Sequence, residues 1–363
     1  MGNPFKFGTV VEEPYFTNRS DEIRFVKSVL SSANNLVLIS PRRYGKTSLV
    51  LRVLNELNRP FLMLDLQVII SADDLAGQLL KKLFRIYPFE KVKHYLKGFK
   101  VVPSVNINPV TNEVDVSFSP NSVAFTSLDD VLGLIGDITK QKNKPVIVFD
   151  EFQEITRIGK DLDKRLRSSM QFHKNVNYVF LGSQESLIRD IFEKKKSPFY
   201  HFGQLMNLER IPFDEFENYL VSGLKSVLKN PAIVSKEILE VTKCHPYYTQ
   251  MLAFTIWELL AEKKESSKVV KDAIDYIIRI HDVDYERLWR TLNRTEMKVL
   301  IGLVKSENLP MSEAFLKDSG AGATSTVFSS LQSLIKKGFL VKRSEDYVFD
   351  DAFFGLWILK RRG

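Results

Sequence analysis

The sequence of 363 residues predicts an α/β fold, in which helices cover both faces of a mostly parallel sheet. Short and nearly continuous apolar runs lie at 35–40, 61–65, 146–150 and 178–182. Such runs are expected when neither face of a strand contacts water. Helical periodicity fills the intervals between them, at 48–57, 72–83, 128–140 and 163–173. Strand and helix therefore alternate along this part of the chain, as in doubly wound domains.

One stretch interrupts this alternation. Apolar and polar residues alternate at 101–119 on both sides of the turn-prone segment 108–112. That pattern predicts a β-hairpin inserted before the helix at 128–140.

The strand signal fades after about Pro212, and helical patterns follow. From Asn293 onward, three helical segments separated by short turns precede two short strands, which is the order of a winged helix. We therefore expect three domains. They are an α/β domain at 1–211, a helical domain at 212–287 and a winged helix at 288–363.

The composition excludes collagen-like and largely disordered proteins. Hydrophobic residues make up 44% of the chain and charged residues 26%, which is typical of a globular protein. Cys244 is the only cysteine, so no disulfide can form within the chain. The start of the sequence lacks a secretory signal pattern, and no run of about 18 apolar residues occurs. We expect a cytoplasmic protein that does not contact a membrane.

The segment 40–47 (SPRRYGKT) lies between a predicted strand and a predicted helix. This is the pattern of a phosphate-binding loop, in which backbone N–H groups and the helix N-terminus surround phosphates. Lys46 would supply a positive charge, the Thr47 hydroxyl would bind Mg²⁺, and Gly45 would let the backbone approach. Ser40 stands where the general pattern has its first glycine. The predicted nucleotide-binding residues of this segment are Pro41, Arg42, Arg43, Tyr44, Gly45, Lys46, Thr47 and Ser48.

The strand predicted at 146–150 ends in two acids, Asp150 and Glu151. Paired with the loop at 40–47, this is the Walker B pattern. Asp150 would reach Mg²⁺ through water, and Glu151 would orient or deprotonate the water that attacks the γ-phosphate. On its own, the same pattern would also fit a strand that ends in a solvated acidic turn.

The next strand ends in Ser183 and Gln184, at the same edge of the sheet. Both are candidates for sensing the γ-phosphate, with Ser183 predicted as catalytic, although any turn contains such residues. A charge-stabilising arginine is also expected, and the sequence does not choose among Arg157, Arg165, Arg167, Arg189 and Arg210.

Six ordered segments closely resemble the archaeal-type ATPases over residues 16 to 260. They are FTNRSDE, SPRRYGKTSL, VIVFDEFQEI, YVFLGSQESL, SPFYHF and CHPYYTQ. This family is grouped with the signal-transduction ATPases with numerous domains, relatives of AAA+ proteins. The resemblance implies a P-loop NTPase core with a helical lid, followed by a winged helix.

The resemblance also implies further contacts with the nucleotide. Phe16, Asn18 and Arg19 would border the adenine and ribose, although Asn18 or Ser20 could instead cap a helix that begins near Asp21. His245 and Pro246 would belong to the lid motif. Cys244 stands where the family usually has a glycine, and His245 could either sense a phosphate or simply start a helix.

Taken together, these patterns predict a Mg²⁺-dependent ATPase that binds ATP and ADP and acts as a regulatory switch. The alternative is a DNA-binding regulator with a weakly active or structural nucleotide site. From Arg290 onward, 12 Lys or Arg and 8 Asp or Glu give a net charge of only +4. The polar residues expected on the exposed face of the second helix of this region are Thr324, Ser325, Thr326, Ser329, Ser330, Ser333 and Lys336. A protein partner, a second copy of the chain and duplex DNA all remain candidate partners.

Overall fold

The computed structural model describes residues 2–17, 19–108, 114–118, 125–139, 144–262, 268–306, 308–343 and 346–363. They form two compact units. One is Val10–Glu209, and the other combines the N-terminal residues up to Thr9 with Arg210–Gly363.

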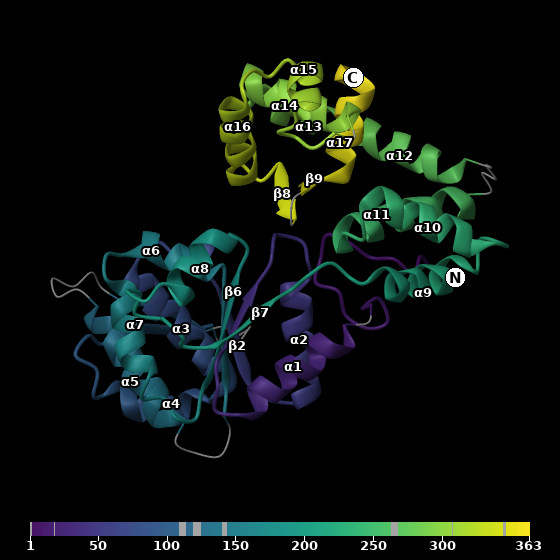
Figure 1. The fold of residues 1–363 in the computed structure, drawn as a ribbon. Helices are drawn as coiled ribbons and strands as arrows, with labels where there is room; N and C mark the ends of the chain where they lie inside the picture. The colour runs from purple at the N-terminus through teal and green to yellow at the C-terminus, as the bar shows by residue number, and fades with distance from the viewer. Residues whose placement is uncertain are drawn as a thin grey trace. The chain divides into compact units, whose positions relative to one another are not determined.

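The first unit is built on a five-stranded parallel sheet in the order β2-β5-β6-β1-β7 (Figure 1). The strands are β1 (Leu36–Ile39), β2 (Phe61–Asp65), β5 (Val146–Asp150), β6 (Asn177–Gly182) and β7 (Gln204–Asn207). The first four confirm the strands expected from apolar runs. β7 was not predicted, because this edge strand has the polar residues Gln204 and Asn207 at its ends and exposes both.

Helices cover both faces of this sheet, which confirms the predicted α/β fold class (Figure 1). α1 (Ser20–Ser31) and α2 (Lys46–Leu57) pack against one face, where the strands contribute residues such as Leu38 and Val148. The opposite face contributes Val37 and Phe149 to a second core cluster. Its helices are α3 (Ala72–Ile86), α5 (Thr126–Ile138), α7 (Leu162–Met170) and α8 (Glu185–Glu193). Shorter helices complete the unit: η1 (Leu66–Val68), α4 (Phe89–Leu96), η2 (Phe152–Glu154) and α6 (Ile155–Ile158).

A hairpin of β3 (Ser104–Ile107) and β4 (Val114–Ser117) interrupts the α/β order, as expected. Val116 packs against the second core cluster, and its carbonyl oxygen would lie 3.3 Å from a Cβ placed on Gly77 of α3. The hairpin is therefore a flap against α3 and not a further strand of the main sheet. Most of the predicted turn, residues 109–112, lies outside the described residues.

The second unit begins with four helices, α9 (Phe213–Leu224), α10 (Pro231–Thr242), α11 (Pro246–Ala261) and α12 (Val269–Ile280). It continues with α13 (Asp282–Arg290), α14 (Arg294–Lys305), α15 (Glu313–Ser319), α16 (Thr324–Lys336), β8 (Leu340–Arg343), β9 (Asp346–Phe349) and α17 (Ala352–Arg362). β8 and β9 pair antiparallel after α16, as a winged helix requires. The sequence patterns did not predict α13 as a separate helix, nor α17.

One hydrophobic core runs through the whole second unit, from Phe216 of α9 to Trp357 of α17. The N-terminal residues belong to it as well. Phe5 is buried, and a Cβ placed on Gly223 would lie 2.5 Å from its ring. The division of this unit into helical and winged-helix domains remains a proposal. None of the helices in the described part of the chain combines the length and apolarity that crossing a membrane requires.

A buried carboxylate joins α14 to α16. Glu296 is fully buried, and its side chain completes a capping box with Asn293 at the start of α14. It also accepts hydrogen bonds from Ser333 Oγ (2.7 Å) and Lys337 Nζ (2.7 and 2.8 Å). The expectation that Ser333 faces solvent is therefore wrong, and Ser330 is buried too. Burial alone would raise the pKa of Glu296, but the hydrogen bonds from Lys337, the Asn293 backbone and Ser333 together lower it.

Replacing Lys337 by Met should lower the free energy of unfolding by about 1–3 kcal/mol at neutral pH, because the buried carboxylate loses its cation. The stabilisation tied to the lowered pKa is fully present above the pKa of glutamate in the unfolded chain, about 4.3. It is lost as the pH falls through the lower pKa of the folded state. Thermal unfolding of both proteins between about pH 7 and pH 3 should therefore show a difference that shrinks as the pH falls.

Lys336→Met is the matched control, since Lys336 is exposed on the same helix. Its unfolding should follow the wild type at each pH. A difference between wild type and Lys337→Met that stays constant with pH would contradict the assignment to Glu296.

Candidate nucleotide-binding site

The carboxyl ends of three adjacent strands, β5, β6 and β1, bring the predicted phosphate loop, the two acids and Ser183 to one edge of the sheet. The loop of residues 40–45 follows β1 and leads into α2. Asp150 ends β5 and Glu151 follows it, while Ser183 follows β6. Parallel pairing places these strand ends side by side, although the phosphate loop and the acids are about a hundred residues apart in sequence.

The loop before α2 has the backbone expected of a phosphate-binding turn. Arg43 and Gly45 adopt left-handed conformations, with φ of 65° and 89°. The Lys46 side chain is 6% exposed, and its Nζ donates to the carbonyl oxygens of Ser40 (2.9 Å) and Pro41 (3.0 Å). Burial lowers the pKa of Lys46, and the charges of Glu151 and Asp150 partly oppose that shift. The ammonium group is thus held within the loop, against backbone oxygens.

The other predicted residues of the loop differ in exposure. Arg42, Arg43 and Gly45 are exposed, and Pro41 is half-buried. Tyr44 is buried in the core beneath α2. Ser48 is also buried, and its hydroxyl accepts a hydrogen bond from the Val11 backbone (3.0 Å). The side chains of Tyr44 and Ser48 therefore support the loop from within the protein.

Two oxygen ligands suitable for a hard cation lie together. Thr47 Oγ1 donates to Asp150 Oδ2 at 3.1 Å. Burial and then the charge of Glu151 raise the pKa of Asp150, opposed by hydrogen bonds from Thr47 and the Glu151 backbone. Among the described residues, no group of three or more His, Cys, Asp or Glu could hold a metal ion. The pair fits Mg²⁺, which is commonly held by few protein oxygens together with phosphates and water.

Glu151 has a strained backbone and an anchored side chain. Its φ is 52°, in the left-handed region. Its Oε2 accepts hydrogen bonds from the Ser183 backbone (3.2 Å), Ser183 Oγ (2.6 Å) and Gln153 Nε2 (2.5 Å). The sequence motifs did not indicate Gln153. The one available signal was two polar residues, Gln153 and Glu154, between Phe152 and Ile155, both of which are buried.

The buried side chain of Arg19 donates a hydrogen bond to the backbone of the phosphate loop. The residue is buried with a φ of 72°, and Nη1 donates to Glu22 (2.7 Å) and to the Glu209 carbonyl (2.8 Å). Its Nη2 donates to the Tyr44 carbonyl at 3.3 Å. The contact with adenine and ribose implied by resemblance remains a prediction for Arg19.

The residues around Arg19 also bear on that prediction. Phe16 is half-buried against the core beneath α2, with the Arg52 guanidinium 5.5 Å from its ring centre. Asn18 lies outside the described residues. α1 begins at Ser20, with Arg19 at the N-cap position and no side-chain cap. Ser20 therefore lies inside the helix and does not cap it.

His245 and Pro246 lie at the start of α11 in the second unit. His245 is the N-cap, and its Nδ1 accepts from the Tyr247 backbone at 3.2 Å. Lys243 and Cys244 are both left-handed, with φ of 51° and 58°. This geometry explains why glycine would suit position 244, since a side chain is strained there. Cys244 nevertheless adopts the left-handed conformation of this turn.

The five arginine candidates all have partners within the described structure. Arg157, Arg165 and Arg189 form ion pairs with Glu154, Asp129 and Glu193. The Arg167 guanidinium lies 4.2 Å from the centre of the Phe202 ring. Arg210 is buried, and its Nη1 donates to the Lys243 carbonyl at 2.7 Å. The geometry does not select one of them as the charge-stabilising arginine.

The fold and this site define a P-loop ATPase, and the family follows from comparison with known sequences. The model of an ATPase domain found predominantly in Archaea matches residues 16–252, and the chain belongs to that family. A model described as a probable winged helix domain matches residues 283–360. None of the curated proteins matches the chain.

Two solved structures are similar to this one in fold. The Walker-type ATPase PABY2304 of Pyrococcus abyssi is 20% identical, with a TM-score of 0.69, and the similarity covers 98% of this chain and 99% of that one. The Aeropyrum pernix Orc1 protein in complex with DNA is 13% identical, with a TM-score of 0.51, over 100% and 98% of the two chains.

Replacing Arg19 by Met should weaken the binding of ATP and GTP equally, by about tenfold, because the Tyr44 carbonyl loses a charge-assisted hydrogen bond that holds the loop. Titration calorimetry with both nucleotides measures this. Arg24→Met is the control, since Arg24 lies on the exposed surface of the same helix. A change confined to ATP would instead favour direct contact with the adenine.

Proposed function

We propose that this protein is a Mg²⁺-dependent ATPase that converts ATP to ADP and phosphate. The observation that carries the proposal is the convergence of Lys46 and Thr47 from one strand end with Asp150 and Glu151 from another. Each residue type has the chemistry that its position in phosphoryl transfer needs. Membership of an archaeal-type ATPase family supports the same conclusion.

Each residue of the site has a separate role in the proposed reaction. The backbone N–H groups of the loop and the start of α2 bind the phosphates of ATP, and the Lys46 ammonium exchanges the Ser40 and Pro41 carbonyls for phosphate oxygens. Thr47 and Asp150 would hold Mg²⁺, which would neutralise charge on the phosphates when bound. Glu151 orients a water and accepts its proton as the water oxygen bonds to the γ-phosphorus. The bond from that phosphorus to the bridging oxygen breaks, which releases ADP.

We further propose that the nucleotide state is coupled to the second unit, as a switch of the kind expected among signal-transduction ATPases. Two adjacent residues at the junction of the units support this. The Glu209 carbonyl accepts from Arg19, which also binds the Tyr44 carbonyl in the phosphate loop. The next residue, Arg210, binds the Lys243 carbonyl, two residues before His245. A shift in the loop could therefore reach the start of α11 through these hydrogen bonds and the peptide bond between Glu209 and Arg210.

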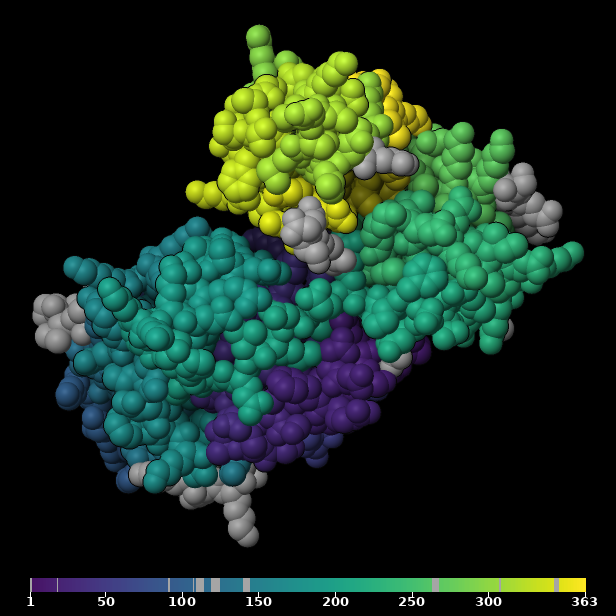
Figure 2. Space-filling view, in the orientation of Figure 1, coloured from purple at the N-terminus to yellow at the C-terminus, as the bar shows by residue number. Residues whose placement is uncertain are grey.

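DNA binding is the second candidate function, and the winged-helix match favours it. The exposed face of α16 presents hydroxyl groups such as Thr324 and Ser329, which suit phosphate contacts. Figure 2 shows the surface of the winged-helix part in yellow-green to yellow.

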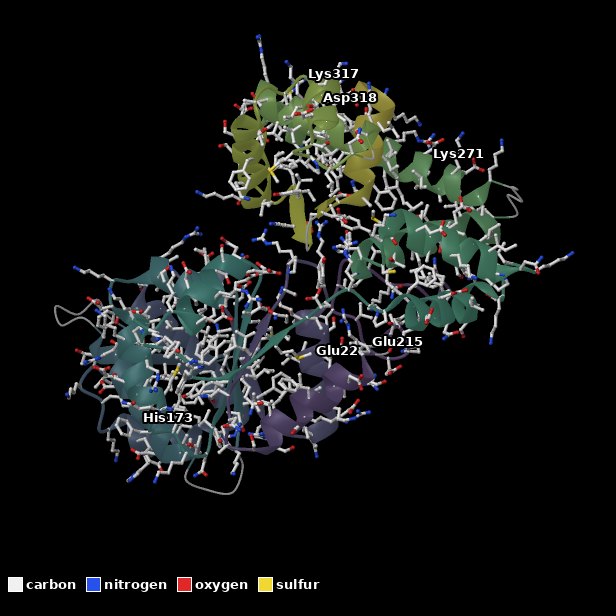
Figure 3. All side chains as sticks on the ribbon, in the orientation of Figure 1. Glu22, His173, Glu215, Lys271, Lys317 and Asp318 are labelled. Carbon is white, nitrogen blue, oxygen red and sulfur yellow. The ribbon has the colours of Figure 1, made fainter. Side chains whose placement is uncertain are left out.

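The charges of the winged-helix part favour a protein partner over DNA. Four of its cations form ion pairs within the unit. The ion pairs are Lys337 with Glu296, Lys360 with Asp275, Arg361 with Asp282 and Arg362 with Glu286. On the exposed side of α15, Lys317 is followed by Asp318 (Figure 3). DNA binding would require a strongly basic surface, whereas residues 290–363 carry a net charge of only +4.

Replacing Glu151 by Gln should lower the rate of phosphate release from Mg-ATP by about 100-fold or more, since the general base is lost. ATP affinity should change little, because the amide keeps the size of the carboxylate. Phosphate release and nucleotide binding are measured for the wild type and the variant, with and without EDTA. Equal turnover by both proteins would contradict the role of Glu151.

The same assay with duplex DNA compares the two candidate functions. We expect that duplex DNA does not stimulate phosphate release. We also expect the protein to bind DNA no more tightly than it binds any other polyanion. Stimulation that falls steeply with rising salt would favour the DNA-binding regulator instead.

A further inference from the structure

The Gln153 side chain has no part in the mechanism above, yet it is 1% exposed at the centre of the site. It lies on η2, directly after the strand that carries Asp150 and Glu151. Its Nε2 donates to Glu151 Oε2 at 2.5 Å. Its Oε1 is buried and has no hydrogen-bond partner among the described residues. Burying an unsatisfied polar atom is unfavourable, so packing alone would favour an apolar residue here.

The neighbouring strand makes room for this amide. A Cβ placed on Gly182, the last residue of β6, would lie 3.0 Å from Gln153 Oε1 and 2.8 Å from the Ile188 side chain. A larger residue at the end of β6 would therefore press on the amide. The next residue, Ser183, donates from both its backbone N and its hydroxyl to the same Glu151 oxygen.

All three hydrogen bonds reach a single oxygen of Glu151. None of the hydrogen bonds in the described structure uses Oε1, which leaves that atom able to accept one from a water molecule. The left-handed backbone of Glu151 directs the side chain, and Gln153 with Ser183 fixes its rotation. A general base that is fixed in this way keeps one defined geometry toward its water.

We propose that Gln153 is a positioning residue for the general base Glu151, holding Oε2 so that Oε1 faces the attacking water. This inference rests on the proposed ATPase function and adds a residue to it. Ser183 supplies the other two donors, so its role in this structure is to hold Glu151.

Replacement of Gln153 by Met tests the proposal, because Met keeps the length and burial of the side chain and removes the donor. The kcat for Mg-ATP should fall about tenfold or more, while KM and ADP affinity stay within about twofold. Gln171→Met is the matched control, since Gln171 is exposed at the end of α7 and away from Glu151. Its kcat should equal that of the wild type.

A second measurement separates positioning from a merely structural role and does not require turnover. ADP with aluminium fluoride mimics the transferring phosphoryl group and its water. Gln153→Met should weaken this complex about tenfold relative to ADP alone, and in a Glu151→Gln background it should cause no further loss. A structural role would instead weaken ADP binding as well, or add its effect to that of Glu151→Gln.

Several results would overturn the inference. They are an unchanged or raised kcat in Gln153→Met, a parallel loss of ADP affinity, and an additive loss of aluminium fluoride binding in the double variant. Failure of the proposed function looks different, because Glu151→Gln would then hydrolyse ATP as fast as the wild type. The inference fails alone when Glu151→Gln is inactive and Gln153→Met retains full activity.

Discussion

The burial of both faces of the parallel sheet is the constraint on which the site depends. With α1 and α2 on one face and α3, α5 and α7 on the other, the strands contribute apolar side chains almost throughout. Polar groups can then emerge only where strands end. The carboxyl edges of β1, β5 and β6 are adjacent, so the phosphate loop, the two acids and Ser183 meet there. One packing requirement therefore assembles residues from three distant parts of the chain.

Local patterns in the sequence were enough to predict four of the five strands, the phosphate loop and the acidic strand end. Each of those features is encoded within a few consecutive residues. What the sequence did not reveal depends on distant contacts. β7 is polar and becomes a strand only by pairing with β1. The aromatic residues of α17 gain their environment from α13, where Tyr285 and Trp289 meet Trp357.

The same distinction applies within the site. The motifs indicated Lys46, Thr47, Asp150 and Glu151, whose positions in sequence carry their chemistry. They did not indicate which groups hold these residues in place. Arg19 contacts a carbonyl 25 residues away, and Ser183 contacts a carboxylate 32 residues away. Such supporting contacts follow from the tertiary fold, so resemblance to a family suggests where to look and the geometry shows what touches what.

The continuous core of the second unit limits how this protein can respond to its nucleotide. Phe353, Phe354 and Trp357 of α17 are buried in the same cluster as the helices that precede the winged helix. Detaching the winged helix would expose these rings, at about 1.5–3 kcal/mol for each large apolar side chain. Release of the winged helix on a tether is therefore costly. The winged helix and the helices before it are therefore tied together by the burial of these three aromatic rings, and separating them would first require that burial to be undone.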